Sequence, residues 1–87
     1  MTYSVELEPA AFRQLKRVPR ANQPRVTEQI NSLADEPRPA GCEKLTDMNN
    51  AWRIRVGDYR VVYVVDDQQQ IVVVTRIGHR RDVYRSR

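Results

Sequence analysis

Residues 51–65 read AWRIRVGDYRVVYVV. Apolar and basic residues alternate along the first segment, 51–56, and apolar residues dominate the second, 59–65. Both segments are typical of β-strands, and the Gly57-Asp58 pair between them suits a two-residue hairpin turn. The stretch therefore predicts an antiparallel pair of strands.

The register of this hairpin assigns each side chain to a face of the sheet. With a two-residue turn, Arg55 lies opposite Arg60, and opposed residues point to the same side. Like charges placed opposite one another destabilise a sheet, so this pair suggests that an anion binds between them. In the alternative interpretation, the guanidinium groups diverge into solvent or pair with Asp58. The apolar face holds Trp52, Ile54, Val56, Tyr59, Val61 and Tyr63, and the basic face, which we expect to be exposed, holds Arg53, Arg55 and Arg60.

The N-terminal part of the chain predicts one strand and two helices. Residues 3–8 alternate between apolar and polar side chains, as a strand with one buried face does. Apolar residues recur at helical spacing in residues 9–18 and again in 21–36. Pro19 and Pro37 are expected to end these helices, because proline cannot continue the helical hydrogen bonds.

The remaining segments complete a single domain. Residues 37–50 are rich in Pro, Gly and Asn and predict a loop, while 71–77 predict the third strand of an antiparallel meander. The tail from His79 onward has room for a short helical turn. The sequence thus predicts one α+β domain over residues 1–87, in the order β-α-α-β-β-β, with a helical hairpin covering one face of an antiparallel-rich sheet.

The positive charge of the chain is unevenly placed. Residues 1–52 carry seven basic and seven acidic side chains, whereas 53–87 carry eight arginines and four aspartates, which accounts for the whole net charge of +4. Arginine suits bidentate phosphate contacts and base stacking, so the excess indicates a nucleic-acid site. The alternative is a surface charge that only keeps the protein in solution. The first helix has its own basic side, formed by Arg13, Lys16, Arg17 and Arg20. This side is either solvated or makes a further contact with nucleic acid.

Several classes of site are excluded by what the sequence lacks. The single Cys42 forms no internal disulfide and no zinc-binding pair, and no carboxylates recur at a spacing that would hold a metal. His79 is the only histidine, which excludes a ribonuclease mechanism that uses a pair of histidines. This histidine either makes a structural hydrogen bond or takes part in catalysis. No segment has the length of a signal peptide or a membrane span. We therefore expect a cytoplasmic protein with no cofactor, no metal and no membrane contact.

The C-terminal stretch concentrates further arginines around one tyrosine. Gly78 allows the chain to bend out of the last strand, so residues 79–84 are expected to fold back beside the basic face. Tyr84 would then stack on a base or exchange a proton, and otherwise it is an ordinary surface tyrosine. Among the arginines of this stretch are Arg76, Arg80, Arg81 and Arg85.

Two strings, WRIRVGDYRVVY at 52–63 and IGHRRDVY at 77–84, resemble the RelE family of toxins in the RelE/ParE superfamily. The opening strand, the helix ending near Pro37 and the Lys44-Leu45 pair extend the resemblance over nearly the whole chain. It implies a type II toxin–antitoxin module of a bacterium or archaeon. Such toxins cleave mRNA in the ribosomal A site and are inhibited by an antitoxin encoded beside them.

The resemblance also implies roles for individual residues. Arg53 and Arg55 match two basic positions that contact the substrate backbone and support catalysis. Arg60 matches the arginine that steadies the reacting phosphate. Arg80 matches one assigned to phosphate stabilisation and assistance to the leaving group, and Tyr84 matches a tyrosine that stacks on or orients the nucleotide.

One departure from the family leaves the proton acceptor open. The best-known members have lysine at the positions of Arg53 and Arg55, and lysine has been proposed there as the general base. Arginine keeps its proton throughout the physiological pH range, so it is a poor base. Tyr84, His79, or the ribosome and substrate themselves are the remaining candidates.

The sequence therefore predicts a ribosome-dependent, metal-independent mRNA endoribonuclease that uses attack by the RNA 2′-hydroxyl. Its expected partners are a cognate antitoxin protein, the ribosome and mRNA. A toxin of the ParE branch, which poisons DNA gyrase, is the first alternative, although that branch lacks the full set of basic positions. The second alternative is a non-catalytic protein that binds its antitoxin and acts with it as a co-repressor on DNA.

Overall fold

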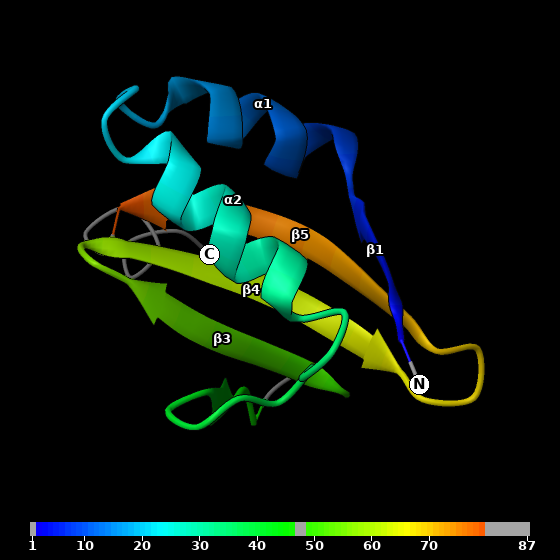
Figure 1. Cartoon of the computed structure of the whole chain (residues 1–87). Helices are drawn as coiled ribbons and strands as arrows, with labels where there is room; N and C mark the ends of the chain where they lie inside the picture. Colours follow the sequence, from blue (N-terminus) through cyan, green and yellow to red (C-terminus); the bar gives the residue numbers. More distant parts are fainter. Residues whose placement is uncertain (1, 47–48, 80–87) are drawn as a thin grey trace.

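Five strands and two helices make up the part of the chain that this computed structural model describes, residues 2–46 and 49–79 (Figure 1). The strands form one sheet in the order β1-β5-β4-β3-β2, and both helices lie on the same face of it. This arrangement confirms the predicted α+β class. In chain order the elements are β1 (Ser4–Leu7), α1 (Pro9–Arg17), α2 (Gln23–Ser32), β2 (Glu43–Lys44), β3 (Ala51–Val56), β4 (Tyr59–Asp66) and β5 (Ile71–His79).

Both helices are shorter than their apolar periodicity predicts, most clearly α2. The first ends before Val18, which is extended because the residue before a proline avoids the helical conformation. The side-chain amide of Gln23 donates hydrogen bonds to the carbonyl oxygens of Val18 at 2.7 Å and Lys16 at 3.2 Å. These bonds satisfy carbonyls that the end of α1 leaves without helical partners. No helix in residues 2–46 and 49–79 is long and apolar enough to cross a membrane.

The β3–β4 hairpin has the predicted register. Arg55 pairs with Arg60 and Val56 with Tyr59, and Gly57 adopts the positive φ of 59° that the tight turn requires. On the other side of β4, β5 runs antiparallel to it and also pairs in parallel with β1.

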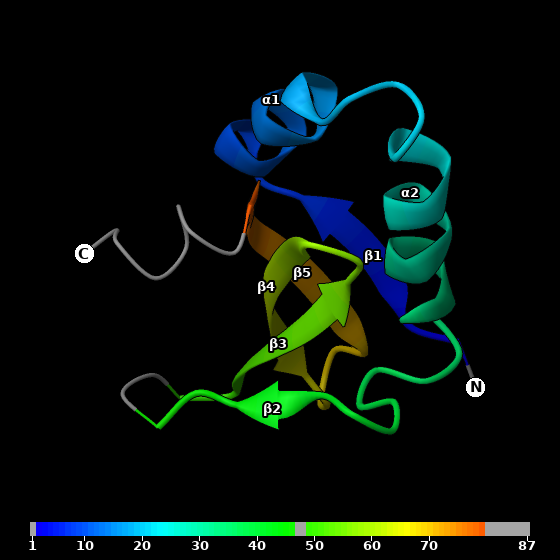
Figure 2. The same ribbon diagram turned by 90° about the vertical axis from the view of Figure 1, so that its left-hand side faces the viewer.

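A strand that the sequence did not predict completes the sheet. Residues 37–50 were expected to be a loop, but Glu43 and Lys44 pair with Arg53 and Trp52 as β2. Figure 2 shows β2 at the edge of the sheet, beyond β3. Two residues are too few to show an alternating pattern, so only the pairing with β3 defines β2 as a strand.

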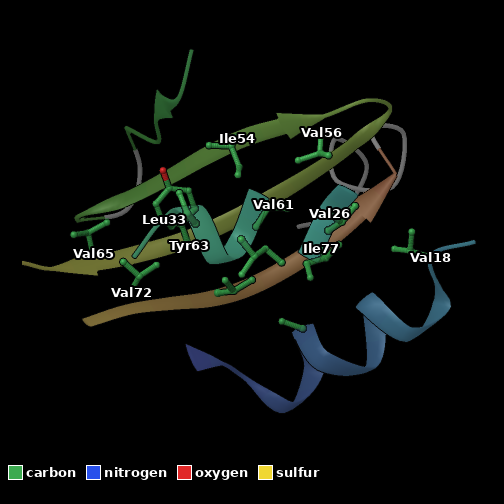
Figure 3. Close-up of a cluster of buried hydrophobic side chains, with 13 residues drawn as sticks. Val18, Val26, Leu33, Ile54, Val56, Val61, Tyr63, Val65, Val72 and Ile77 are labelled. Carbon is green, nitrogen blue, oxygen red and sulfur yellow. The ribbon is translucent and has the colours of Figure 1, made fainter. Parts of the chain in front are cut away.

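The hydrophobic core fills the space between the helices and the covered face of the sheet (Figure 3). The predicted apolar face of the hairpin is confirmed, with Trp52 and Tyr59 only partly buried at its ends. Tyr63 is fully buried, and its hydroxyl donates a hydrogen bond of 2.7 Å to the carbonyl oxygen of Pro37. The core residues are Ala11, Val18, Val26, Ile30, Leu33, Ile54, Val56, Val61, Tyr63, Val65, Val72, Val74 and Ile77.

An irregularity in β5 changes which of its side chains face the core. Tyr63 pairs with Val74 and Val62 with Arg76, so Thr75 is an extra residue in β5. Such a bulge reverses the alternation of side chains beyond it. Ile77 therefore reaches the core, and Arg76 lies on the opposite face.

The expectation that the chain bends out of the sheet at Gly78 is wrong. The strand continues through Gly78 to His79, and these residues pair with Arg60 and Tyr59. The predicted helical turn after His79 lies outside the described residues.

Candidate functional site

The face of the sheet opposite the helices holds two rows of paired residues across β3, β4 and β5. In the first row Arg55 pairs with Arg60, which pairs with Gly78. The parallel row is Arg53, Val62 and Arg76. This surface is the basic face of the predicted hairpin, extended onto β5 by Arg76, so that four of the six positions in these rows are arginines.

The three arginines predicted from the hairpin differ in their exposure to solvent. Arg55 is exposed and Arg53 is intermediate, but only 4% of the surface of Arg60 is exposed. The expectation of an exposed Arg60 is therefore wrong. Burial restricts the motion of a long side chain, so the charge of Arg60 is held in place before any ligand arrives. It also means that replacing Arg60 affects packing as well as charge.

All three arginines line one cavity of about 450 Å³ at the open edge of β3. Its other walls come from α2 and from the loop that leads to β2. We call it the arginine hollow, and it is lined by Gln29, Pro39, Ala40, Gly41, Glu43, Arg53, Ile54, Arg55 and Arg60.

Glu43 is the residue of the hollow that sequence reasoning missed. It lies opposite Arg53 in the β2–β3 pair, and its Oε1 accepts hydrogen bonds from Nε of Arg53, at 3.1 Å, and from Nη2. These hydrogen bonds hold the pKa of the Glu43 carboxyl below its usual value, with help from the charges of Arg53, Arg55 and Arg60. The hollow therefore favours a negative charge at the position of this carboxylate. No local signal could identify Glu43, since it becomes part of the site only through the pairing of β2.

The remaining predicted residues are not gathered into the same cavity. His79 packs edge-on against Tyr59, with ring centroids 5.5 Å apart, and it lines a different hollow from the three arginines. Arg80 and Tyr84 lie outside the described residues, so their proposed roles stay predictions. Across residues 2–46 and 49–79, no cluster of three His, Cys, Asp or Glu side chains could hold a metal ion.

Concentrated positive charge in a partly enclosed hollow suits a phosphate group. Arginine presents several N–H donors in a planar fork that matches phosphate oxygens, and its charge does not depend on pH in the physiological range. The arginine hollow can therefore bind a phosphate and stabilise additional negative charge that develops on it.

Comparison with known proteins identifies the family. The family described as "ParE toxin of type II toxin-antitoxin system, parDE" matches residues 5–84. The toxin RelG of Mycobacterium tuberculosis is 33% identical to the chain over 90 residues, which cover 98% of this chain and 99% of RelG. The chain belongs to the RelE family of type II toxins.

An archaeal toxin and a solved archaeal structure are also similar to this chain, the first in sequence and the second in sequence and fold. The putative toxin RelE1 of Methanocaldococcus jannaschii is 28% identical, with 99% of both chains covered. The crystal structure of the RelE-RelB complex from Pyrococcus horikoshii matches with a TM-score of 0.81 and 29% identity, covering 92% of this chain and 97% of that one. The match therefore spans whole chains.

Proposed function

We propose that this RelE-family toxin is a ribosome-dependent endoribonuclease that cleaves mRNA in the A site. The observation that carries the proposal is the arginine hollow, in which Arg53, Arg55 and Arg60 line one cavity with a carboxylate beside them. The protein supplies the positive charge itself, so the reaction we propose uses no metal. In this proposal the ribosome presents the mRNA and so supplies much of the orientation of the reacting groups.

The proposed reaction is an internal displacement at phosphorus. The 2′-oxygen of the RNA forms a bond to the adjacent phosphorus, the bond from phosphorus to O5′ breaks, and O5′ takes up a proton. The products are a 2′,3′-cyclic phosphate and a 5′-hydroxyl end. Arg60, held in place by burial, and the more exposed Arg55 stabilise the extra negative charge of the transition state.

Glu43 is our candidate for the group that accepts the 2′-hydroxyl proton. It is the one carboxylate lining the arginine hollow within the described part of the chain, and arginine cannot serve as a base. Its lowered pKa keeps it ionised at neutral pH but makes it a weak base. We therefore assign most of the rate enhancement to the arginines. Arg80 and Tyr84 remain the predicted groups for the leaving oxygen and for stacking.

A cognate antitoxin is the proposed protein partner. Related toxins from Pyrococcus horikoshii and Mycobacterium tuberculosis were solved as complexes, RelE-RelB and RelBE2 respectively. The net charge of +4, all of it contributed by residues 53–87, favours an acidic antitoxin segment on the basic face. Co-expression with the neighbouring gene and a pulldown would test this pairing.

The matching family description favours a second candidate, a ParE-type poison of DNA gyrase. A gyrase poison has no need of a site that stabilises charge on a phosphate, which is why we rank it second. One pair of assays separates the two functions. Purified toxin added to ribosomes programmed with mRNA is expected to cut within the A-site codon and to leave DNA supercoiling by gyrase unchanged. Intact mRNA together with trapped gyrase–DNA complexes would reverse the ranking. Neither effect, with antitoxin binding retained, would indicate the non-catalytic co-repressor.

The Glu43 assignment has its own test. Glu43→Gln keeps the size of the side chain and removes its ability to take a proton. We expect it to slow single-turnover cleavage by about 10²-fold, as removal of a general base does. Unchanged cleavage would show that another group accepts the proton, and it would not contradict the role proposed for the arginines.

A further inference from the structure

A second hollow, of about 300 Å³, lies where α1 ends beside the last residues of β5. It exists because β1 is short: the pairing of β1 with β5 stops at Val74, and the chain then turns into α1. Beyond that point the edge of β5 is open, and the backbone N–H of Ile77 donates instead to Oε1 of Gln14 at 2.7 Å. The lining residues are Gln14, Arg17, Val18, Tyr59, Arg76, Ile77, Gly78 and His79.

We infer that this second hollow binds the phosphate of a nucleotide that flanks the scissile one on the same RNA strand. The inference deepens the proposed function and rests on it. Arg17 and Arg76 supply the charge, and the rings of Tyr59 and His79 offer a surface against which a base or ribose can lie.

Within residues 2–46 and 49–79, no acidic side chain neutralises the two arginines that line this hollow. No Asp or Glu is among the described residues that line it, and neither Arg17 nor Arg76 forms an ion pair within the described chain. Arg38 shows the contrasting case. It forms an ion pair of 2.7 Å with Asp67 and lies over the ring of Trp52, so its charge has a partner inside the protein.

The geometry of the sheet links the two hollows. Arg60 lines the arginine hollow and Gly78 lines the second one, and the two residues are paired neighbours on β4 and β5. Figure 1 shows the end of β5 beside the turn between β3 and β4. Neighbouring strands are about 4.8 Å apart, so β3 and β5 are separated by roughly 10 Å, a span that two nucleotides of an extended strand can cover. Gly78 itself adds no side chain to this row.

The test uses the full-length toxin and an RNA hexanucleotide methylated at every 2′-oxygen, which cannot be cleaved by 2′-oxygen attack. Binding is followed by NMR titration, which reports on the backbone amides of Ile77, Gly78 and His79 as well as on affinity. The test variant is Arg17→Ala with Arg76→Ala. Its matched control is Arg13→Ala with Arg20→Ala, which removes two exposed arginines that line neither hollow and so changes the net charge equally.

We expect the test variant to bind the hexanucleotide about tenfold more weakly than the control, as the loss of a charge-assisted phosphate contact implies. The slope of log affinity against log salt concentration should fall by about 0.7, the value for one lost phosphate contact on a single strand. The control should bind like the unmodified toxin within about twofold, because Arg13 and Arg20 line neither hollow and their exposed charges are screened by solvent and salt.

The outcomes separate this inference from the proposed function. Equal affinity and equal salt slope in the test variant and its control would overturn the second hollow alone, while ribosomal cleavage would still stand. A selective loss of affinity in a toxin that fails to cut ribosomal mRNA would support the second hollow and contradict the proposed nuclease. If the unmodified toxin does not shift its Gly78 and His79 amides on adding RNA, the inference is overturned.

Discussion

The two faces of the sheet use their side chains in opposite ways. On the covered face, valine, leucine, isoleucine and Tyr63 pack against the helices and leave no charge to interact with a ligand. On the basic face, Arg55 lies directly opposite Arg60, and like charges placed opposite one another destabilise a sheet, whereas Arg53 is paired with Glu43. The comparison indicates that the covered face supplies the free energy of folding, and it supports the proposal that the basic face is a binding surface.

Arg60 is where this comparison is most easily broken, because it lies on the basic face and is buried. Arg60→Met removes the charge and keeps an unbranched side chain, and it should slow single-turnover cleavage on programmed ribosomes by about 10²–10³-fold, as loss of a group that stabilises a developing anion does. Arg60→Lys keeps the charge without the planar fork and should slow cleavage less than Arg60→Met does.

Thermal unfolding and binding to the antitoxin serve as controls for the Arg60 variants. Cleavage at the unmodified rate by a folded Arg60→Met protein would show that this arginine is structural, and would remove it from the proposed site.

A substitution on the covered face should lower stability without changing the rate of cleavage by the folded protein. Leu33 is 1% exposed in the core, and Leu33→Ala should lower the free energy of unfolding by about 3 kcal/mol, through lost burial and the cavity left behind. Chemical denaturation measures this loss. The fraction that remains folded should still cleave mRNA at the unmodified rate. A large fall in that rate at full folding would mean that the two faces are not independent.

A smaller effect is expected where the core meets the loop that forms a wall of the arginine hollow. Burial raises the pKa of the Tyr63 hydroxyl, which donates to the carbonyl oxygen of Pro37. Tyr63→Phe keeps the ring and removes this bond, so we expect a loss of about 1 kcal/mol in unfolding free energy. Hydrogen exchange should show faster opening of the loop at residues 38–42. No change in either measurement would show that the bond adds nothing to the position of the loop.

The smallest effect concerns the pH dependence of stability. Because the arginines lower the pKa of Glu43 in the folded protein, its ionised form stabilises the fold at pH values above the usual glutamate pKa of about 4.3. That stabilisation is lost as the pH falls through the lowered pKa. The stability of the unmodified toxin relative to Glu43→Gln should therefore decline below about pH 4, measured as the difference in midpoint of unfolding. A difference that stays constant down to pH 2 would mean that the Arg53–Glu43 contact is not formed in solution.

What the sequence predicted correctly was determined by neighbouring residues. The Gly57-Asp58 turn and the alternation on each side of it were sufficient to pair Arg55 with Arg60 and to place Arg53 on the same face. The order of the elements other than β2 and the covered apolar face followed from periodicity in the same way.

The features that were missed depend on contacts between distant segments. Glu43 joins the arginine hollow only because β2 pairs with β3, and Arg76 joins the basic face only because Thr75 is an extra residue in β5. The burial of Arg60 follows from tertiary packing rather than from any local pattern. Arg80 and Tyr84 lie beyond the described residues, and their roles stay predictions from the family resemblance.

The central claim is that the arginine hollow promotes attack by the 2′-oxygen of RNA on the adjacent phosphate. It is tested most directly by programming ribosomes with an mRNA in which a single A-site nucleotide lacks its 2′-hydroxyl. Cleavage at that position should disappear, while the unmodified mRNA should yield a 5′-hydroxyl end and a 2′,3′-cyclic phosphate. Cleavage of the 2′-deoxy mRNA at the same position and rate would contradict the mechanism, because the proposed nucleophile would be absent.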